Sequence, residues 1–130
     1  MPTLRPDLTR QPPGHLWTLL SVAKLLERYD PFHRIGLKRR DLAYYQNAKP
    51  ESTHAPPTQR QAGYSRSRIA WLLREGWEDP PEVDWVWRGP TPAYLVFLDG
   101  HHRLCAATLA GDTHILISYS GPLSEIPKLS

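Results

Sequence analysis

The segment YLVFLDGHHRLCAATLAG, residues 94–111, constrains the fold more than any other part of the chain. It opens with a continuous apolar run, which is typical of a strand covered on both faces. The run ends at Asp99-Gly100, and the small and apolar residues that follow have the spacing of a helix packed against a core. The segment therefore predicts a buried strand that passes through a glycine directly into a helix.

The first turn of that predicted helix carries His101, His102 and Arg103. N–H groups in a first helical turn lack intrahelical partners and carry a partial positive charge, so they attract anions. Gly100 lets the backbone approach a ligand, and the three side chains add hydrogen-bond donors at the same place. The junction is therefore a candidate phosphate or nucleotide site.

Asp99 leaves two further interpretations open. Its carboxylate could hold a histidine in one tautomer and so serve the candidate site. It could also be an ordinary N-cap, with the three residues after Gly100 exposed to solvent and without a ligand. The local sequence does not separate these two arrangements.

The rest of the chain alternates strand and helix signals. We expect strands at residues 15–20, 82–87, 94–98 and 114–120, and helices at 21–29, 39–46, 65–76 and 101–111. Ser21 and Ser65 are the expected N-caps, and Asp30-Pro31 should stop the first helix. This order predicts a small mixed α/β domain with a mixed sheet of about four strands flanked by helices.

A chain of 130 residues is long enough for one domain and too short for two independent cores. Residues 1–14 are rich in proline and predict an irregular arm, followed by a domain over residues 15–130. Residues 47–64 contain three prolines and almost no large aliphatic side chains. They predict a long exposed loop, and such loops are usually mobile or functional.

Composition restricts the class of protein. Cys105 is the only cysteine, which excludes an internal disulfide framework and favours a reducing, cytoplasmic compartment. The N-terminal residues lack the apolar core of a signal peptide, and no later apolar run has membrane-spanning length, so we expect no membrane partner. A net charge of +3 permits contact with nucleotides or nucleic acid without requiring it.

Other polar and aromatic residues suggest weaker hypotheses. The histidines do not have metal-ligand spacing, so we expect no protein-bound metal. Mg²⁺ would arrive with nucleotide phosphates and be assisted by Asp99 or another carboxylate. A basic face for DNA or a triphosphate could form from residues 37–41 with Arg34, Arg60, Arg66 and Arg68. Stacking on bases could use Trp71, Trp77, Trp85 and Trp87, although their pattern favours core packing.

The segment from Ile69 to Ser120, with its LDGHHRLCAATLAG junction, resembles the ParB N-terminal and sulfiredoxin fold family. Many members of that family have a D-G-x-H-R-like segment at this junction, followed by an alanine-rich helix, a glycine and a strand. The resemblance implies a nucleotide, ATP or CTP, whose phosphates rest on the helix N-terminus. It assigns Gly100, His101, His102 and Arg103 to those phosphates.

The sequence departs from two branches of this family. Sulfiredoxins resemble it but have their reactive cysteine where this chain has His101, and Cys105 lies one helical turn further on among apolar residues. We therefore expect Cys105 to be a small buried hydrophobe and not a nucleophile. Partition ParB proteins have a glutamate- and arginine-rich box at this junction and further domains, so a sliding DNA clamp is not expected.

Two other branches resemble the chain more closely. Free-serine kinases share the D-G-H-H-R spelling and use a carboxylate base, for which Glu27 and Asp30 are the candidates that the predicted topology allows. The simpler interpretation is that Glu27 is a solvated helix residue and Asp30 a turn residue. Small plasmid- or mobile-element-borne members are similar in size, and some are described as nucleases or nucleotide hydrolases.

Three functional hypotheses follow. The first is an enzyme of DNA maintenance or mobile-element biology that hydrolyses or transfers a nucleotide's terminal phosphate. His101, His102 and Arg103 would neutralise the charge that develops on the phosphoryl group, with His101 nearest that phosphate. The second is a DNA nuclease in which a histidine or carboxylate, with a metal, activates water. The third is a non-catalytic nucleotide- or DNA-binding module whose state is read by a protein partner or by a second copy.

Overall fold

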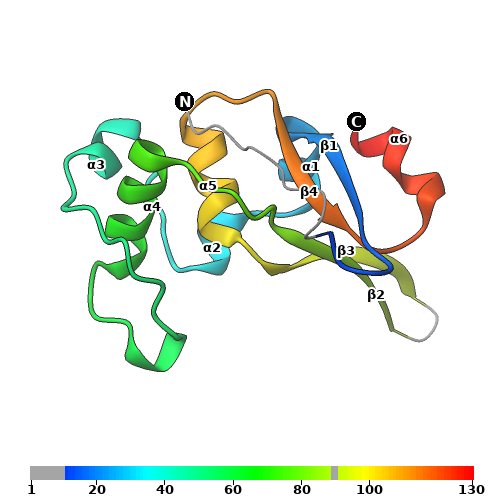
Figure 1. Cartoon of the computed structure of the whole chain (residues 1–130), viewed down its shortest axis with the longest axis horizontal. Helices are drawn as coiled ribbons and strands as arrows, with labels where there is room; N and C mark the ends of the chain where they lie inside the picture. Colours follow the sequence, from blue (N-terminus) through cyan, green and yellow to red (C-terminus); the bar gives the residue numbers. More distant parts are fainter. Residues whose placement is uncertain (1–10, 89–90) are drawn as a thin grey trace.

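The computed structural model describes residues 11–88 and 91–130, apart from the side chains of residues 87, 88 and 91–93. The fold is mixed α/β with a four-stranded mixed sheet flanked by helices, which confirms the predicted fold class. The strands are β1 (Leu16–Ser21), β2 (Glu82–Arg88), β3 (Thr91–Asp99) and β4 (His114–Tyr119). Their order in the sheet is β1-β4-β2-β3 (Figure 1).

Both edges of the sheet are antiparallel and its centre is parallel. β1 pairs with β4 and β2 pairs with β3 in antiparallel register, and β2 and β4 run parallel to each other. A parallel pair needs a crossover connection, and the chain from β3 through the next helix to β4 provides one. The helix that follows β3 therefore lies against the sheet by topology.

Most of the described helices are short, and two of them have nine residues or more. They are α1 (Val22–Arg28), α2 (Pro31–Arg34), α3 (Leu42–Gln46), α4 (Tyr64–Glu75), α5 (His101–Leu109) and α6 (Ile126–Leu129), with single 3₁₀ turns η2 (Pro57–Gln59) and η3 (Leu123–Glu125). Ser21 caps α1 as predicted, because its side chain accepts a hydrogen bond from the Lys24 N–H at 3.3 Å. Gly76 follows the last residue of α4 and has a positive φ of 75°, within one residue of the predicted end of this helix.

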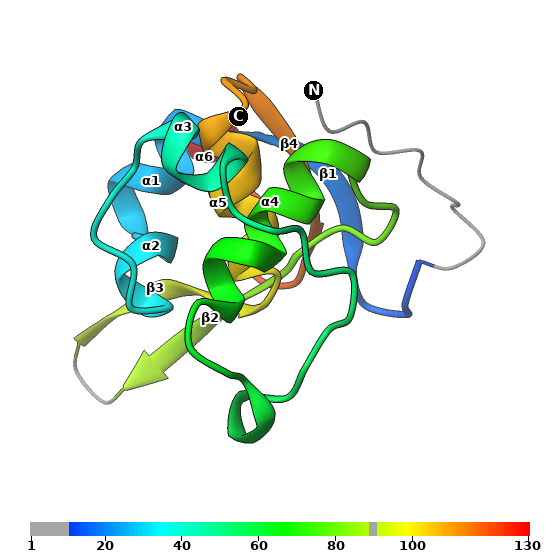
Figure 2. The same cartoon turned by 90° about the vertical axis from the view of Figure 1, so that its left-hand side faces the viewer.

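Helix α5 lies at the centre of the molecule, between the sheet and α4 (Figures 1 and 2). One side of it, with Leu104 and Ala107, packs in a cluster with the sheet and α1. The other side, with Cys105 and Ala106, packs in a second cluster with α2, α3 and α4. A helix buried on both sides needs small residues to let its neighbours approach, which explains the alanine-rich sequence of α5.

Several local predictions were wrong. Ser65 is not the N-cap of α4, because the helix begins at Tyr64 with Gly63 in the cap position. The predicted stop at Asp30-Pro31 is confirmed, since α1 ends at Arg28, but the chain turns there into α2, whose Phe32 and His33 N–H groups Asp30 caps. The short C-terminal helix α6 was not predicted, although Leu129 within it is fully buried.

The remaining predictions have mixed outcomes. Trp85 belongs to the core, as expected, and its indole N–H donates to the Tyr119 hydroxyl at 2.8 Å. The Trp87 side chain and residues 1–10 of the expected arm lie outside the described part of the chain. Within the part that is described, no helix combines the length and hydrophobicity needed to cross a membrane.

Candidate functional site

A cavity of about 570 Å³, here called the α5 pocket, opens where β3 ends and α5 begins. It lies at the segment that the sequence identified. Its side chains are mostly cationic or titratable, and they come from α2, the 47–64 loop, α4 and α5: Arg34, His54, Arg60, Arg68, His101, His102 and Arg103. Asp99 is the one carboxylate among the described residues that line it.

Gly100 is required at the junction by backbone geometry. Its φ is +92°, a left-handed conformation that side chains disfavour, and a Cβ built there would lie 2.4 Å from Cβ of Pro81. Gly100 occupies the N-cap position of α5, and no described side chain caps the helix. The first-turn N–H groups are thus left for another acceptor, as an anion site needs.

Asp99 does not play either of the roles weighed from the sequence. Its Oδ1 accepts the Gly100 N–H at 2.7 Å, and its Oδ2 accepts from Nη2 of Arg103 at 3.1 Å. Within the described chain it therefore neither caps α5 nor forms a hydrogen bond with a histidine. Arg103 also donates through Nη1 to the Asp79 carbonyl, so its guanidinium fastens the junction to the turn before β2.

His101 packs its ring against two aromatic side chains. Its centroid lies 5.7 Å from that of Tyr29 and 6.4 Å from that of Phe97. Nε2 of His101 is buried and has no hydrogen-bond partner among the described residues. Burial, followed by the positive charge of Arg34, lowers the pKa of His101 below its usual value, while Asp99 opposes the shift. The imidazole is therefore neutral at pH 7.

His102 is almost completely buried, with 7% of its surface exposed. Its Nε2 lies 3.0 Å from Oγ of Ser65, and its ring meets the edge of Tyr64. Burial, reinforced by the charge of Arg60, lowers the pKa of His102 to about 3. The expectation that His102 adds positive charge to the site is thus corrected: it contributes a neutral, hydrogen-bonded imidazole.

The other cations of the α5 pocket are Arg34, Arg60 and Arg68, which the sequence placed in a possible basic face. Arg60 is held by a hydrogen bond from Nε to the Ala55 carbonyl at 2.9 Å, and its guanidinium lies over the Tyr64 ring. Arg68 donates through Nη1 to the Ser52 carbonyl at 2.7 Å. These contacts also fasten the 47–64 loop, which projects beside α4 in Figure 2, to the wall of the pocket.

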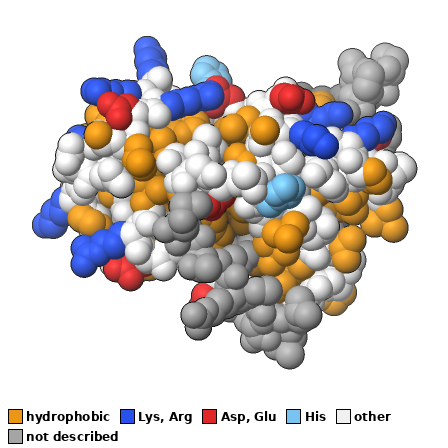
Figure 3. All heavy atoms as spheres, turned by 90° about the horizontal axis from the view of Figure 1, so that it is seen from above, with side chains coloured by type: hydrophobic (Ala, Val, Ile, Leu, Met, Phe, Trp, Pro, Cys, Tyr) orange, Lys and Arg blue, Asp and Glu red, His pale blue; other side chains and the backbone are white. Residues whose placement is uncertain are grey.

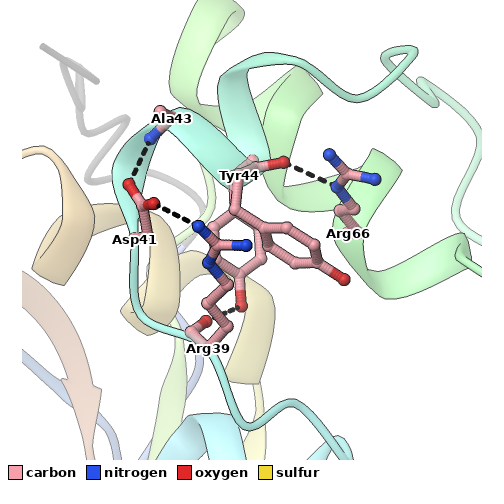
Figure 4. Close-up of polar contacts among 6 residues, drawn as sticks. Arg39, Asp41, Ala43, Tyr44 and Arg66 are labelled. Atoms are coloured by element: carbon pink, nitrogen blue, oxygen red, sulfur yellow. Dashed lines mark hydrogen bonds and ion pairs between the residues drawn. The ribbon is translucent and has the colours of Figure 1, made fainter.

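The other members of the expected basic face have different positions. Arg66 donates to the Tyr44 carbonyl at 2.6 Å and stacks on the Tyr44 ring, and Arg39 pairs with Asp41 at 2.8 Å (Figure 4). On the face shown in Figure 3, Lys and Arg side chains lie apart and are interspersed with apolar and acidic ones. The arginines of the expected basic face therefore divide between the α5 pocket and local structural contacts.

Glu27 and Asp30 do not belong to the described lining of the α5 pocket. Glu27 is exposed on α1. Asp30 accepts hydrogen bonds at the N-terminus of α2 and pairs with Arg40. Glu27 is thus a solvated helix residue, whereas Asp30 is the N-cap of α2 and not only the turn residue that the simpler interpretation gave.

Cys105 is fully buried within the second cluster of α5. Burial raises the pKa of its thiol well above the usual range, so the thiol stays protonated. A thiolate mechanism needs the opposite shift and an accessible sulfur. The position of Cys105 is therefore that of a small packing residue.

A divalent ion finds few ligands at this site. No group of three or more His, Cys, Asp or Glu side chains gathers at one point in the described part of the chain. Asp99 could assist an ion that phosphates already hold, but its two oxygens accept hydrogen bonds from Gly100 and Arg103. The residues present do not form a magnesium site of their own.

Comparison of the chain with protein-family models, with curated proteins and with solved structures gave no match. The chemistry of the α5 pocket is therefore argued from its own residues. Sequence reasoning missed Ser65 and His54 as parts of the pocket. Neither has a local signal, because each reaches the junction only through the packing of α4 and the preceding loop against α5.

Proposed function

We propose that the protein binds a nucleoside triphosphate, ATP or CTP, by its phosphates in the α5 pocket and hydrolyses or transfers the terminal phosphoryl group. The observation that carries the proposal is the convergence of Arg34, Arg60 and Arg68 with the uncapped N-terminus of α5. Polyphosphates are bound by several charge-assisted hydrogen bonds from guanidinium groups and by backbone N–H groups at helix N-termini. Both kinds of donor line this cavity.

The same groups suit phosphoryl transfer. Fixed arginines and backbone N–H groups stabilise the charge on the phosphoryl oxygens as the bond to the leaving oxygen breaks. His101 supplies a neutral imidazole at the start of α5, which can orient the attacking hydroxyl or water and accept its proton. Its lowered pKa makes it a weak base, so we assign most of the expected rate enhancement to positioning and charge.

The resemblance of the D-G-H-H-R segment to the ParB and sulfiredoxin family supports a nucleotide as the ligand. A cytoplasmic location without a membrane partner agrees with this function. DNA maintenance or mobile-element biology is the context that the resemblance suggests. A protein partner or a homodimer would be needed only if the nucleotide-bound state acts as a signal.

One experiment separates the hypotheses. Wild-type protein is titrated calorimetrically with inorganic tripolyphosphate, ATP and CTP, with and without Mg²⁺, and the same mixtures are assayed for released phosphate and, with plasmid DNA, for nicking. Binding of tripolyphosphate and of a nucleotide, with release of phosphate, is the expected result. Nucleotide binding without release would favour the module, and nicking would favour the nuclease. Failure of every polyphosphate to bind would overturn the assignment of the α5 pocket.

A further inference from the structure

A second cavity, of about 610 Å³, adjoins the α5 pocket and shares Arg68, Leu72 and Arg103 with it. We call it the tryptophan pocket, because Trp71 and Trp77 line it together with acidic residues that follow α4. Because they share three side chains, the two cavities lie next to each other. An extended ligand that occupied both would pass beside Arg68 and Arg103.

The aromatic wall of the tryptophan pocket is held in place by its neighbours. The Arg68 guanidinium lies over the Trp71 ring, 5.1 Å from its centroid, and Trp77 is partly buried and packs against both core clusters. Arg68 covers one face of the Trp71 ring and both indoles are half-buried, so the apolar surface that they leave exposed is held in one orientation. A planar heterocycle is the kind of group that stacks on such a surface.

Acidic side chains give the tryptophan pocket a different chemistry from the α5 pocket. Glu75, Glu78 and Asp79 line it together with the two shared arginines. Ionised carboxylates only accept hydrogen bonds, so they match hydroxyl and amino groups and repel a second polyanion. The combination of an aromatic wall with acceptors fits a nucleoside, which has a planar base, ribose hydroxyls and ring or amino N–H donors.

We infer that the tryptophan pocket binds the nucleoside half of the nucleotide whose phosphates occupy the α5 pocket. The base lies along the Trp71 and Trp77 wall, and Glu75 and Glu78 accept hydrogen bonds from its donors or from the ribose. Arg68 and Arg103 stand between the two halves, beside the phosphate nearest the ribose. This inference rests on the proposed function of the α5 pocket and adds the site that distinguishes a nucleotide from a bare polyphosphate.

The test compares ATP with inorganic tripolyphosphate on the full chain. Wild type should bind ATP about tenfold more tightly or better, the scale of one stacked base. Glu78→Gln, at an exposed residue of the pocket, should weaken ATP about fivefold, because an amide oxygen accepts a weaker hydrogen bond than a carboxylate, and leave tripolyphosphate equal or slightly tighter. Charge removal alone would tighten both ligands, so the opposite signs are diagnostic. Glu125→Gln, a carboxylate outside both pockets, should change neither affinity.

Two results would overturn the inference, and they differ from each other. Equal affinities for ATP and tripolyphosphate, with Glu78→Gln tightening both, would place the nucleoside outside the tryptophan pocket and leave the phosphate site intact. Failure of tripolyphosphate to bind would remove the α5 pocket as a phosphate site, and the inference with it. Tryptophan fluorescence that responds to ATP but not to tripolyphosphate, and that loses its response in Trp71→Phe, would support it.

Discussion

Nε2 of His102 lies 3.0 Å from Oγ of Ser65, which joins the first turn of α5 to the first turn of α4 across 37 residues of sequence. This contact separates two adjacent histidines into two environments. His102 is buried beneath the pocket, and His101 lies at its wall against Tyr29 and Phe97. A pair that looks equivalent in the sequence therefore consists of one residue that holds the site together and one that can meet a ligand.

The burial of His102 predicts that acid destabilises the protein. Its pKa falls from 6.5 to about 3 on folding, so below pH 6.5 the unfolded chain binds a proton that the folded chain does not. Stability is then full above pH 6.5 and decreases as the pH falls toward 3, with a slope approaching about 1.4 kcal/mol per pH unit. Urea unfolding between pH 7 and pH 5 measures the slope.

Replacing His102 with Gln keeps a polar group beside Ser65 and removes the titration. The variant should lose stability at pH 7 but show a shallower dependence on pH than wild type. Carboxylates that titrate in the same range contribute equally to both proteins, so the difference between the two slopes belongs to His102. Equal slopes of unfolding free energy against pH in the two proteins would show that folding does not lower the pKa of His102.

Gly100 and Gly63 offer a matched pair for backbone strain. Both are N-cap glycines with positive φ, +92° and +80°, but only Gly100 has a neighbour, Pro81, within 4 Å of a built Cβ. Gly63→Ala should cost about 1 kcal/mol, from the left-handed conformation alone. Gly100→Ala should cost at least about 2 kcal/mol, because the contact with Pro81 adds to that strain. Equal losses of unfolding free energy in the two variants, measured by urea unfolding, would show that the backbone at Gly100 moves away from Pro81 without further cost.

Local signals explain why this junction could be predicted. An apolar run, a glycine and a small-residue helix follow one another within 18 residues, so the turn and the start of α5 needed no information from elsewhere in the chain. The strand order β1-β4-β2-β3 and the burial of Leu129 in α6 depend on distant contacts. The segment around Leu129 contains Pro127 and has no helical periodicity, so no local pattern predicted helix α6.

The pocket lining was harder to predict for the same reason. Arg66 and Arg68 are two residues apart on α4, where side chains point to different sides, and only Arg68 reaches the α5 pocket. Arg34 and Arg60 join it from separate segments. Charge in the sequence showed that cations were abundant, but which of them converge is decided by helix packing.

Arg34 tests the cationic character of the α5 pocket. It is exposed and close enough to His101 to lower the pKa of that imidazole. Arg34→Ala should weaken tripolyphosphate by about 1–2 kcal/mol, somewhat less than a fully buried charge-assisted hydrogen bond because solvent screens the site. Arg28→Ala, at an exposed arginine on α1 outside the pocket, is the control for charge alone. Equal effects of the two substitutions, measured by calorimetry in 0.15 M salt, would indicate nonspecific attraction.

Arg103 should behave differently from Arg34. Its guanidinium holds Asp99 and the Asp79 carbonyl, and only 18% of its side-chain surface is exposed. Arg103→Ala should therefore weaken nucleotide binding by roughly 1.5–3 kcal/mol and also lower the stability of the protein. Calorimetry and urea unfolding on the same variant separate the effects. A stable variant with unchanged affinity would exclude Arg103 from the phosphate site.

Cys105 should take no part in nucleotide binding or catalysis. Because its thiol is fully buried and its pKa is raised, a thiol-reactive reagent should modify it only after unfolding. Cys105→Ala should leave nucleotide binding and turnover unchanged and cost about 1 kcal/mol of stability through lost packing. Loss of turnover in a variant that remains folded and binds nucleotide would restore a thiol mechanism.

His101 distinguishes an enzyme from a binding module. The neutral imidazole stands at the start of α5, and under the proposed function it lies nearest the terminal phosphate. An interaction made mainly in the transition state changes turnover without changing ground-state affinity. His101→Ala should therefore keep nucleotide affinity within about threefold and reduce the rate of phosphate release on the order of a hundredfold, the scale of one acid–base or electrostatic group.

His101→Gln, which retains a hydrogen-bonding side chain but cannot accept the proton, should recover affinity and folding but little of the rate. Recovery of most of the rate by Gln would assign His101 to positioning alone. Tight nucleotide binding by wild type with no release of phosphate in any condition would mean that the protein is a binding module and does not hydrolyse the nucleotide.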